Sequence, residues 1–134
     1  MTTNERGEGM RIAIVGSRDW QDKQAVIDYV NALPDGDTVI SGGARGVDTF
    51  AEEAVYRHGG LEFEKYPALW DWLGKSAGYI RNQDIVNAAS KIVAFHDGKS
   101  SGTAHTIKLA RKAGKPVEVH YPDGRIEIYE GKQS

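Results

Sequence analysis

The sequence predicts an α/β protein of the Rossmann-like, doubly wound class, with a mainly parallel sheet of about five strands and a C-terminal edge strand. Two observations predict this class. Short β-branched segments alternate along the chain with segments whose apolar residues repeat at helical spacing. Glycine-rich stretches follow two of the predicted strands, where the chain turns into a helix. Such alternation is typical of a parallel sheet covered by helices on both faces.

Short apolar segments predict the strands of the parallel sheet. A glycine or a proline directly follows three of them, which is a strand-terminating signal. The predicted strands are 11–15, 38–41, 63–66, 91–95 and 116–119. The final stretch YPDGRIEIY contains a turn followed by alternating apolar and polar residues, which predicts a solvent-facing edge strand.

Apolar residues at helical spacing predict four helices between these strands. The first begins at an Asp22 cap and is stopped by Pro34. The second spans 48–58 and is followed by two glycines, which are common after a helix C-terminus. Two more are predicted over 77–89 and across 107–113.

Length and composition favour one domain over 11–130. A chain of 134 residues with 40% hydrophobic content can bury a single core. The polar residues 1–10 are expected to form a disordered leader, with translation starting at Met1 or Met10, and 131–134 form a tail. These first residues lack the apolar stretch of a signal peptide, and no run approaches a membrane span, so a cytoplasmic protein is expected.

Charge and cysteine content exclude several kinds of site. Lys and Arg total 17 against 19 Asp and Glu, so the chain is not a polycation that coats nucleic acid. The absence of cysteine excludes a disulfide framework, a thiolate nucleophile and a Cys-based zinc site. No metal site and no cofactor are predicted.

The loops that follow four predicted strands carry the unusual residues: GSRDW, SGGARGVD, PALWDWLGK and HDGKSSGT. Because ligands of doubly wound sheets bind at the carboxyl ends of the strands, we expect these loops to open on one edge. Glycines let backbone amides approach a ligand, and helix N-termini add positive dipole ends. Cations lie in or beside the same loops, namely Arg18, Arg45, Lys75, Arg81 and Lys99. The sequence therefore predicts an anionic ligand, most simply a phosphate.

The predicted ligand-binding residues all come from these loops and the helices that follow them. They are Gly16, Ser17, Arg18, Ser41, Gly42, Gly43, Arg45, Gly46, Asp48, Trp70, Lys75, Arg81, Asn82, Asp97, Ser101, Gly102 and Thr103. Structural roles compete with some of these assignments, since Asp48 and Thr103 are placed to be helix N-caps and Asp97 precedes a turn glycine. Trp20 and Trp70 are candidates to stack on a base or ribose, although tryptophans more often pack in a core.

Neither of two well-known phosphate-binding motifs is present. SGGARGVD lacks the GK[ST] ending of a P-loop, so magnesium-dependent triphosphate chemistry is not indicated. The first loop is not GxGxxG, and no acidic residue ends the second strand to hold a ribose. NAD-dependent hydride transfer is therefore not predicted.

Four motifs, in this order and spacing, closely resemble the SLOG superfamily and, within it, the YspA-like group: GSRD, SGGARGVDTFAEEA, PALWDWLGKSAGYIRNQDI and VAFHDGKSSGTAHTI. The resemblance covers about 11–119. It implies a Rossmann-like fold that binds nucleotides or nucleotide-derived molecules. Relatives include the Lonely Guy phosphoribohydrolases, DNA processing protein A, which binds single-stranded DNA, and sensors of ADP-ribose-type signals.

One departure from this resemblance bears on catalysis. The Lonely Guy hydrolases carry a glutamate in a GTxxE motif, whereas 102–106 here reads GTAHT and has no carboxylate. Arg81 matches the helical arginine of those enzymes. The catalytic residues therefore stay open, with Arg81, Asp19 and Asp97 as candidates and Glu53 as a further carboxylate.

Three functions follow as hypotheses. The first is the binding of a phosphorylated nucleoside or nucleotide-derived signal, such as AMP or ADP-ribose, by a sensor or sequestering protein. The second is a nucleoside 5′-monophosphate phosphoribohydrolase or a related N-glycosidase. The third is a single-stranded DNA-binding module, against which the balanced charge and short length argue. A homodimer is implied by the resemblance to the hydrolases.

Overall fold

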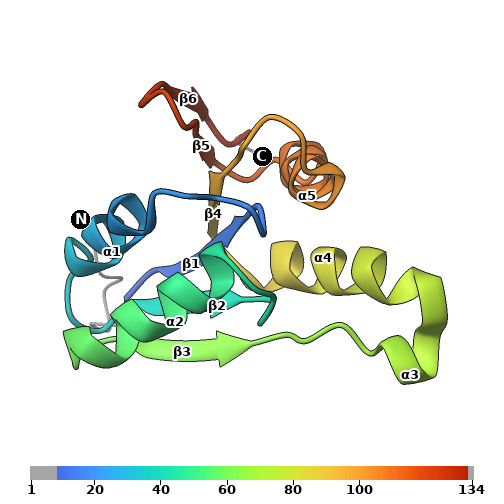
Figure 1. Ribbon diagram of the computed structural model, residues 1–134, viewed down its shortest axis with the longest axis horizontal. Helices are drawn as coiled ribbons and strands as arrows, with labels where there is room; N and C mark the ends of the chain where they lie inside the picture. Colours follow the sequence, from blue (N-terminus) through green and yellow to red (C-terminus); the bar gives the residue numbers. More distant parts are fainter. Residues whose placement is uncertain (1–8, 133–134) are drawn as a thin grey trace.

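A single six-stranded sheet organises the protein, whose computed structural model describes residues 9–132 except for the side chain of Lys75 (Figure 1). The strand order is β3-β2-β1-β4-β5-β6. All neighbouring strands pair in parallel except β5 and β6, which are antiparallel. The strands are β1 (Arg11–Gly16), β2 (Thr38–Ser41), β3 (Glu62–Lys65), β4 (Lys91–Phe95), β5 (Val117–His120) and β6 (Ile126–Tyr129). The predicted fold class and its edge strand are confirmed.

Helices cover both faces of the sheet. The helices α1 (Lys23–Asn31) and α2 (Val47–His58) pack on one face, and α4 (Ala77–Ala88) and α5 (Ser101–Lys112) pack on the other (Figure 1). In the described part of the chain, no helix is long and apolar enough to cross a membrane. The predicted boundaries of the domain, including the leader, depend in part on residues outside the described range and stay predictions.

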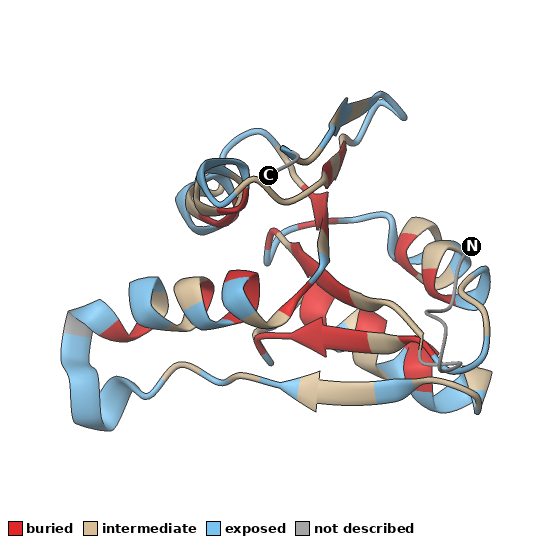
Figure 2. Ribbon diagram, turned by 180° about the vertical axis from the view of Figure 1, so that it is seen from behind, coloured by how far each residue is buried: buried red, intermediate tan, exposed pale blue. Residues whose placement is uncertain are grey.

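β1 explains why the fold class is readable from sequence. Ile12 and Ile14 pack against the face covered by α1 and α2, whereas Ala13 and Val15 belong to the core under α4 and α5. Figure 2 shows the central strands buried. Because both faces are covered, the strand is continuously apolar rather than alternating. Asp22 caps α1 as predicted, since its side chain accepts a hydrogen bond from the amide of Ala25.

A short helix between β3 and α4 was not predicted. This helix, α3 (Trp70–Leu73), is followed by a turn of 3₁₀ helix, η1 (Gly74–Ser76), and the pair lies at the far end of α4 from the sheet (Figure 1). None of the α3 side chains is buried. A four-residue helix without a buried face leaves no periodic pattern for sequence reasoning to find.

The strand order reverses next to β1. The chain runs from β1 outward to β2 and β3, then crosses back so that β4 pairs with the other side of β1. Loops that leave adjacent parallel strands on either side of such a point diverge and leave room for a ligand. The loops after β1 and β4 are therefore placed to build a site.

Candidate functional site

A cavity of about 590 Å³ opens at the carboxyl edge of the sheet, and we call it the edge cavity. Its walls come from the end of β1, the loops after β1, β2 and β4, the first turns of α2 and α5, one face of α4, and α3. The convergence of loops that the sequence predicted is thus observed.

Most of the predicted ligand-binding residues line the edge cavity. Those that do are Gly16, Arg18, Gly42, Asp48, Trp70, Arg81, Asn82, Asp97, Ser101, Gly102 and Thr103. Ser17, Ser41, Gly43, Arg45 and Gly46 are not in its wall. The side chain of Lys75 lies outside the described residues. Of the catalytic candidates, Asp19, Arg81 and Asp97 line the cavity, whereas Glu53 does not and is paired with Lys23.

Sequence reasoning missed part of the wall. The missed residues are Val15, Ala44, Gly78, Tyr79, Ile85, Ser100 and Thr106, and Lys99 was named only as a nearby cation. Gly78, Asn82 and Ile85 lie four and three residues apart on α4, so they share one helix face. Helical spacing from the predicted residue Asn82 could therefore have found Gly78 and Ile85 from the sequence.

Buried hydrogen bonds join the loops after β1 and β4. Ser17 donates its amide to the carbonyl of Phe95 (3.1 Å), and its hydroxyl accepts the amide of Asp97 (3.1 Å). Ser17 is nearly inaccessible to solvent. Ser17 therefore holds the two loops together, and its predicted contact with a ligand stays a prediction.

Asp97 forms a turn, which confirms the structural role that the sequence offered for it. Its Oδ1 accepts the amides of Lys99 (2.8 Å) and Ser100 (2.9 Å). Burial raises the pKa of Asp97, but these amide hydrogen bonds outweigh that effect and hold the pKa below its ordinary value. A carboxylate kept ionised in this way is poorly suited to donate a proton.

The N-cap of α5 is Ser100, so the predicted cap role of Thr103 is wrong. The hydroxyl of Ser100 accepts the amide (3.2 Å) and the hydroxyl (3.0 Å) of Thr103. The helix begins three residues earlier than that prediction requires, because Asp97 folds the loop into a turn. The space beside Gly102 is open, which leaves this first turn accessible from the cavity.

The predicted cap role of Asp48 is also wrong. Gly46, with φ of +78°, is the N-cap of α2, and Asp48 lies in the first turn of the helix. Its Oδ2 accepts the amide of Ala44 (2.9 Å), which holds the glycine loop against the helix. Glycine adopts such a positive φ at little cost, so the helix can begin here without a side-chain cap.

Asp48 is the most unusual ionisable group of the cavity wall. Only 6% of the residue is exposed, and among the described residues its Oδ1 has no hydrogen-bond partner. Burial raises the pKa of Asp48 to about 6; the amide of Ala44, the charge of Arg81 and the nearby Ser41 and Gly42 oppose this effect.

Arg81 is held in place by its neighbours. Its Nη1 donates to the carbonyl of Gly42 (3.0 Å) and its Nε to Oδ1 of Asn82 (3.2 Å). The Asn82 amide lies 3.1 Å from Nδ1 of His105 on α5. Burial lowers the pKa of Arg81, the negative charge of Asp48 raises it, and nearby Arg18 lowers it further.

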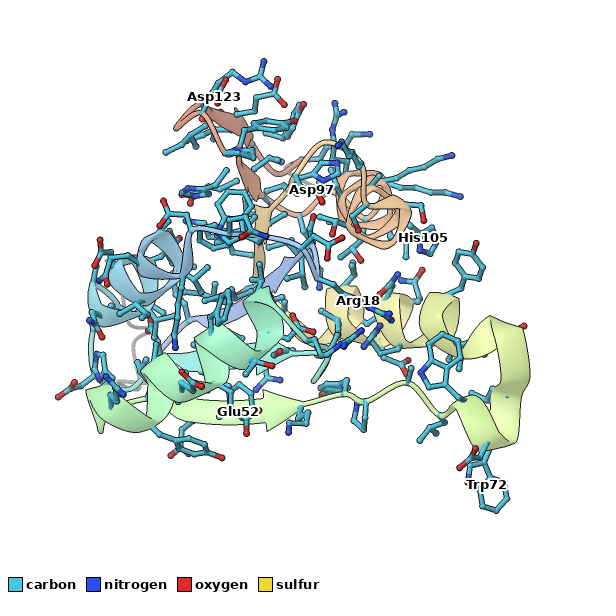
Figure 3. The ribbon with its side chains drawn as sticks, viewed as in Figure 1. Arg18, Glu52, Trp72, Asp97, His105 and Asp123 are labelled. Atoms are coloured by element: carbon cyan, nitrogen blue, oxygen red, sulfur yellow. The ribbon has the colours of Figure 1, made fainter. Side chains whose placement is uncertain are left out.

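Among the described residues, three cations and three carboxylates line the edge cavity. Arg18, Arg81 and Lys99 supply positive charge. The carboxylates are Asp19, Asp48 and Asp97. Backbone amides stabilise the ionised form of Asp97, whereas Asp48, with a pKa raised to about 6, loses its charge as the pH falls below that value. Figure 3 shows Arg18 near α4, with Asp97 and His105 on the α5 side.

Gly46 provides a test of the loop geometry. A Cβ at Gly46 would lie 2.6 Å from the carbonyl oxygen of Arg18 and 2.8 Å from that of Ser17. We expect Gly46→Ala to lower the free energy of unfolding by about 2–3 kcal/mol, measured by urea denaturation. Gly124→Ala is the matched control, because Gly124 also has a positive φ but nothing within 4 Å. Equal losses in the two variants would contradict the role of crowding.

A parallel sheet covered on both faces, with a cavity at the reversal of its strand order, defines a Rossmann-like α/β protein. A model of the family described as DNA recombination-mediator protein A matches residues 3–63. The Gene 61 protein of Mycobacterium phage D29 is 40% identical over 116 residues, which span 80% of this chain and 93% of that protein. The chain belongs to the family of this phage protein.

Solved structures of DNA processing protein A share the fold. The protein from Helicobacter pylori has a TM-score of 0.64 and 24% identity, over 84% of this chain and 65% of that chain. The protein from Streptococcus pneumoniae has a TM-score of 0.70 and 21% identity, over 83% of this chain and 50% of that chain. The present chain thus spans between half and about two thirds of these relatives.

Proposed function

We propose that this protein binds single-stranded DNA, with backbone phosphates held in the edge cavity. The observation that carries the proposal is that Arg18 and Arg81 face one cavity together with the accessible first turn of α5. Guanidinium groups and helix N-terminal amides are both strong phosphate partners. The structure of the H. pylori relative concerns its binding of single-stranded DNA, and the match over residues 3–63 is to a recombination mediator family; both support this choice.

On sequence alone, the near-zero net charge favours a small nucleotide ligand over DNA. Net charge is a weak guide here, because binding depends on the local field of a few cations at the site rather than on the whole chain. A small nucleotide-derived ligand remains the second candidate, since the cavity volume of about 590 Å³ falls in the range of small-molecule sites. The YspA-like assignment and the homodimer stay predictions.

Hydrolysis of a nucleotide is less well supported. The GTAHT segment places Thr106, not a carboxylate, in the cavity wall. Asp97 is occupied by backbone amides, which leaves Asp19 as the cavity carboxylate with no assigned structural partner among the described residues. Release of free base from AMP, measured by chromatography and lost in Asp19→Ala, would establish this activity.

The proposal predicts a specific salt dependence. A fluorescently labelled single-stranded oligonucleotide should bind more tightly than the same sequence as a duplex, measured by anisotropy. The logarithm of the affinity should fall with the logarithm of salt concentration with a slope of about −1.4, as expected for about two neutralised phosphates. Tight binding of AMP or ADP-ribose, with no oligonucleotide binding at low salt, would favour the second candidate instead.

A further inference from the structure

Trp70 lies at the rim of the edge cavity and is not part of a hydrophobic core. Its side chain lines the edge cavity, and yet 52% of the residue is exposed. In the described part of the chain, no other ring stacks on it and its indole donates no hydrogen bond. The indole therefore presents free aromatic surface at the rim of the cavity that Arg18 and Arg81 line.

The position of this ring depends on a glycine. A Cβ at Gly78 would lie 3.2 Å from Cη2 of Trp70, so the glycine lets the indole rest closely against the start of α4. Tyr79 follows directly, is 64% exposed and contacts His105 edge-to-face with ring centroids 4.8 Å apart. Trp70 and Tyr79 thus flank the cavity that contains Arg81, from α3 and α4.

Trp72 shows what an unrelated exposed tryptophan looks like on the same helix. It is 85% exposed and absent from the cavity wall, and its side chain points away from the body of the protein (Figure 3). Both tryptophans lack a buried environment, but only Trp70 faces the cations. General exposure of α3 therefore does not account for the placement of Trp70.

We propose that Trp70 is a stacking platform for an unpaired nucleobase of the strand whose phosphate occupies the edge cavity, with Tyr79 beside it. This inference rests on the proposed function and adds where a base is held. Aromatic faces next to phosphate-binding cations are the combination by which proteins bind single strands without sequence preference. The bases of a duplex are already stacked, so the platform selects unpaired strands.

The test compares two strands with equal phosphates. One probe is an oligo-dT and the other an abasic strand of the same length, and both affinities are measured by anisotropy. We expect wild type to bind oligo-dT about tenfold more tightly than the abasic strand. Trp70→Ala should remove this preference and retain the weaker binding of the abasic strand, whereas Trp72→Ala, the matched control, should keep the preference. Trp70→Phe should restore most of it.

The outcomes separate the inference from the proposed function. If wild type binds neither strand, both fail. If wild type prefers oligo-dT and Trp70→Ala keeps that preference, or Trp72→Ala loses it equally, the stacking platform is wrong while DNA binding stands. Should Trp70→Ala unfold, as judged by circular dichroism, the Trp72→Phe variant supplies the answer. Quenching of its tryptophan fluorescence by oligo-dT, and not by the abasic strand, supports stacking, because the remaining Trp20 is buried; equal signals overturn it.

Discussion

Arg81→Ala is expected to weaken oligonucleotide binding by about 10- to 100-fold, measured by anisotropy at moderate salt. The reason is that a charge-assisted hydrogen bond contributes about 1.5–3 kcal/mol, and Arg81 is held toward the cavity by the Gly42 carbonyl and by Asn82. The loss should come mainly from faster dissociation, because a positioned phosphate contact is removed rather than a distant steering charge.

Two variants control for charge and for folding. Lys112→Ala removes one positive charge from the exposed last turn of α5, away from the cavity, and should change affinity less than twofold at moderate salt. Arg81→Lys keeps the charge but loses the planar fork, so an intermediate loss is expected. If Lys112→Ala weakened binding as much as Arg81→Ala, net charge rather than the edge cavity would explain the affinity.

Asp48 is expected to make binding stronger at acidic pH. Its pKa is raised to about 6, so the group is mostly ionised at pH 7.5 and mostly neutral at pH 5. Loss of this negative charge beside Arg81 leaves a more positive cavity. Oligonucleotide affinity should therefore rise about tenfold from pH 7.5 to 5, as judged from the interaction of charges several ångströms apart in a partly buried site. Backbone phosphodiesters do not titrate in this range.

Asp48→Asn isolates this effect. The variant should bind at pH 7.5 as tightly as wild type does at pH 5, and its affinity should be nearly flat over this range. The charged group that acts on Asp48 is Arg81, and a guanidinium keeps its charge throughout this range. A pH dependence that persists in Asp48→Asn would show that Asp48 is not its source.

The same group has a consequence for stability. The folded-state pKa of Asp48 is above its ordinary value of 3.8, so the folded state binds this proton more tightly than the unfolded state does. The resulting stabilisation is fully present below about pH 3.8 and is lost as pH rises through about 6. Asp48→Asn should therefore raise the thermal midpoint at pH 7.5 more than at pH 5; the opposite ranking would contradict burial as the cause.

Sequence reasoning predicted the parts of the site that depend on local signals. Gly42 was found because its glycine pair directly follows a strand, Gly102 because it lies in the second glycine-containing loop segment, and Arg81 because it matches a known helical arginine. The caps show where local signals fail. Asp48 and Thr103 have cap-forming side chains, but the positive φ of Gly46 and the turn at Asp97 start both helices earlier. The conformation of the neighbouring backbone, rather than the type of side chain, determined which residue became the N-cap of each helix.

By itself the sequence determined the fold class, the strand segments and the edge of the sheet on which the loops open. These follow from periodicity and chain order, since continuously apolar strands require cover on both faces and parallel strands end at one edge. Only the tertiary structure decided which side chains face the cavity. Arg18 and Arg81 line it, whereas Arg45 does not. Among residues 9–132, Asp48 is buried with no hydrogen-bond partner for its Oδ1, and Trp70 lines the cavity while Trp72 does not. The physical reason is that direction and burial depend on packing between segments distant along the chain, which residue type and spacing do not specify.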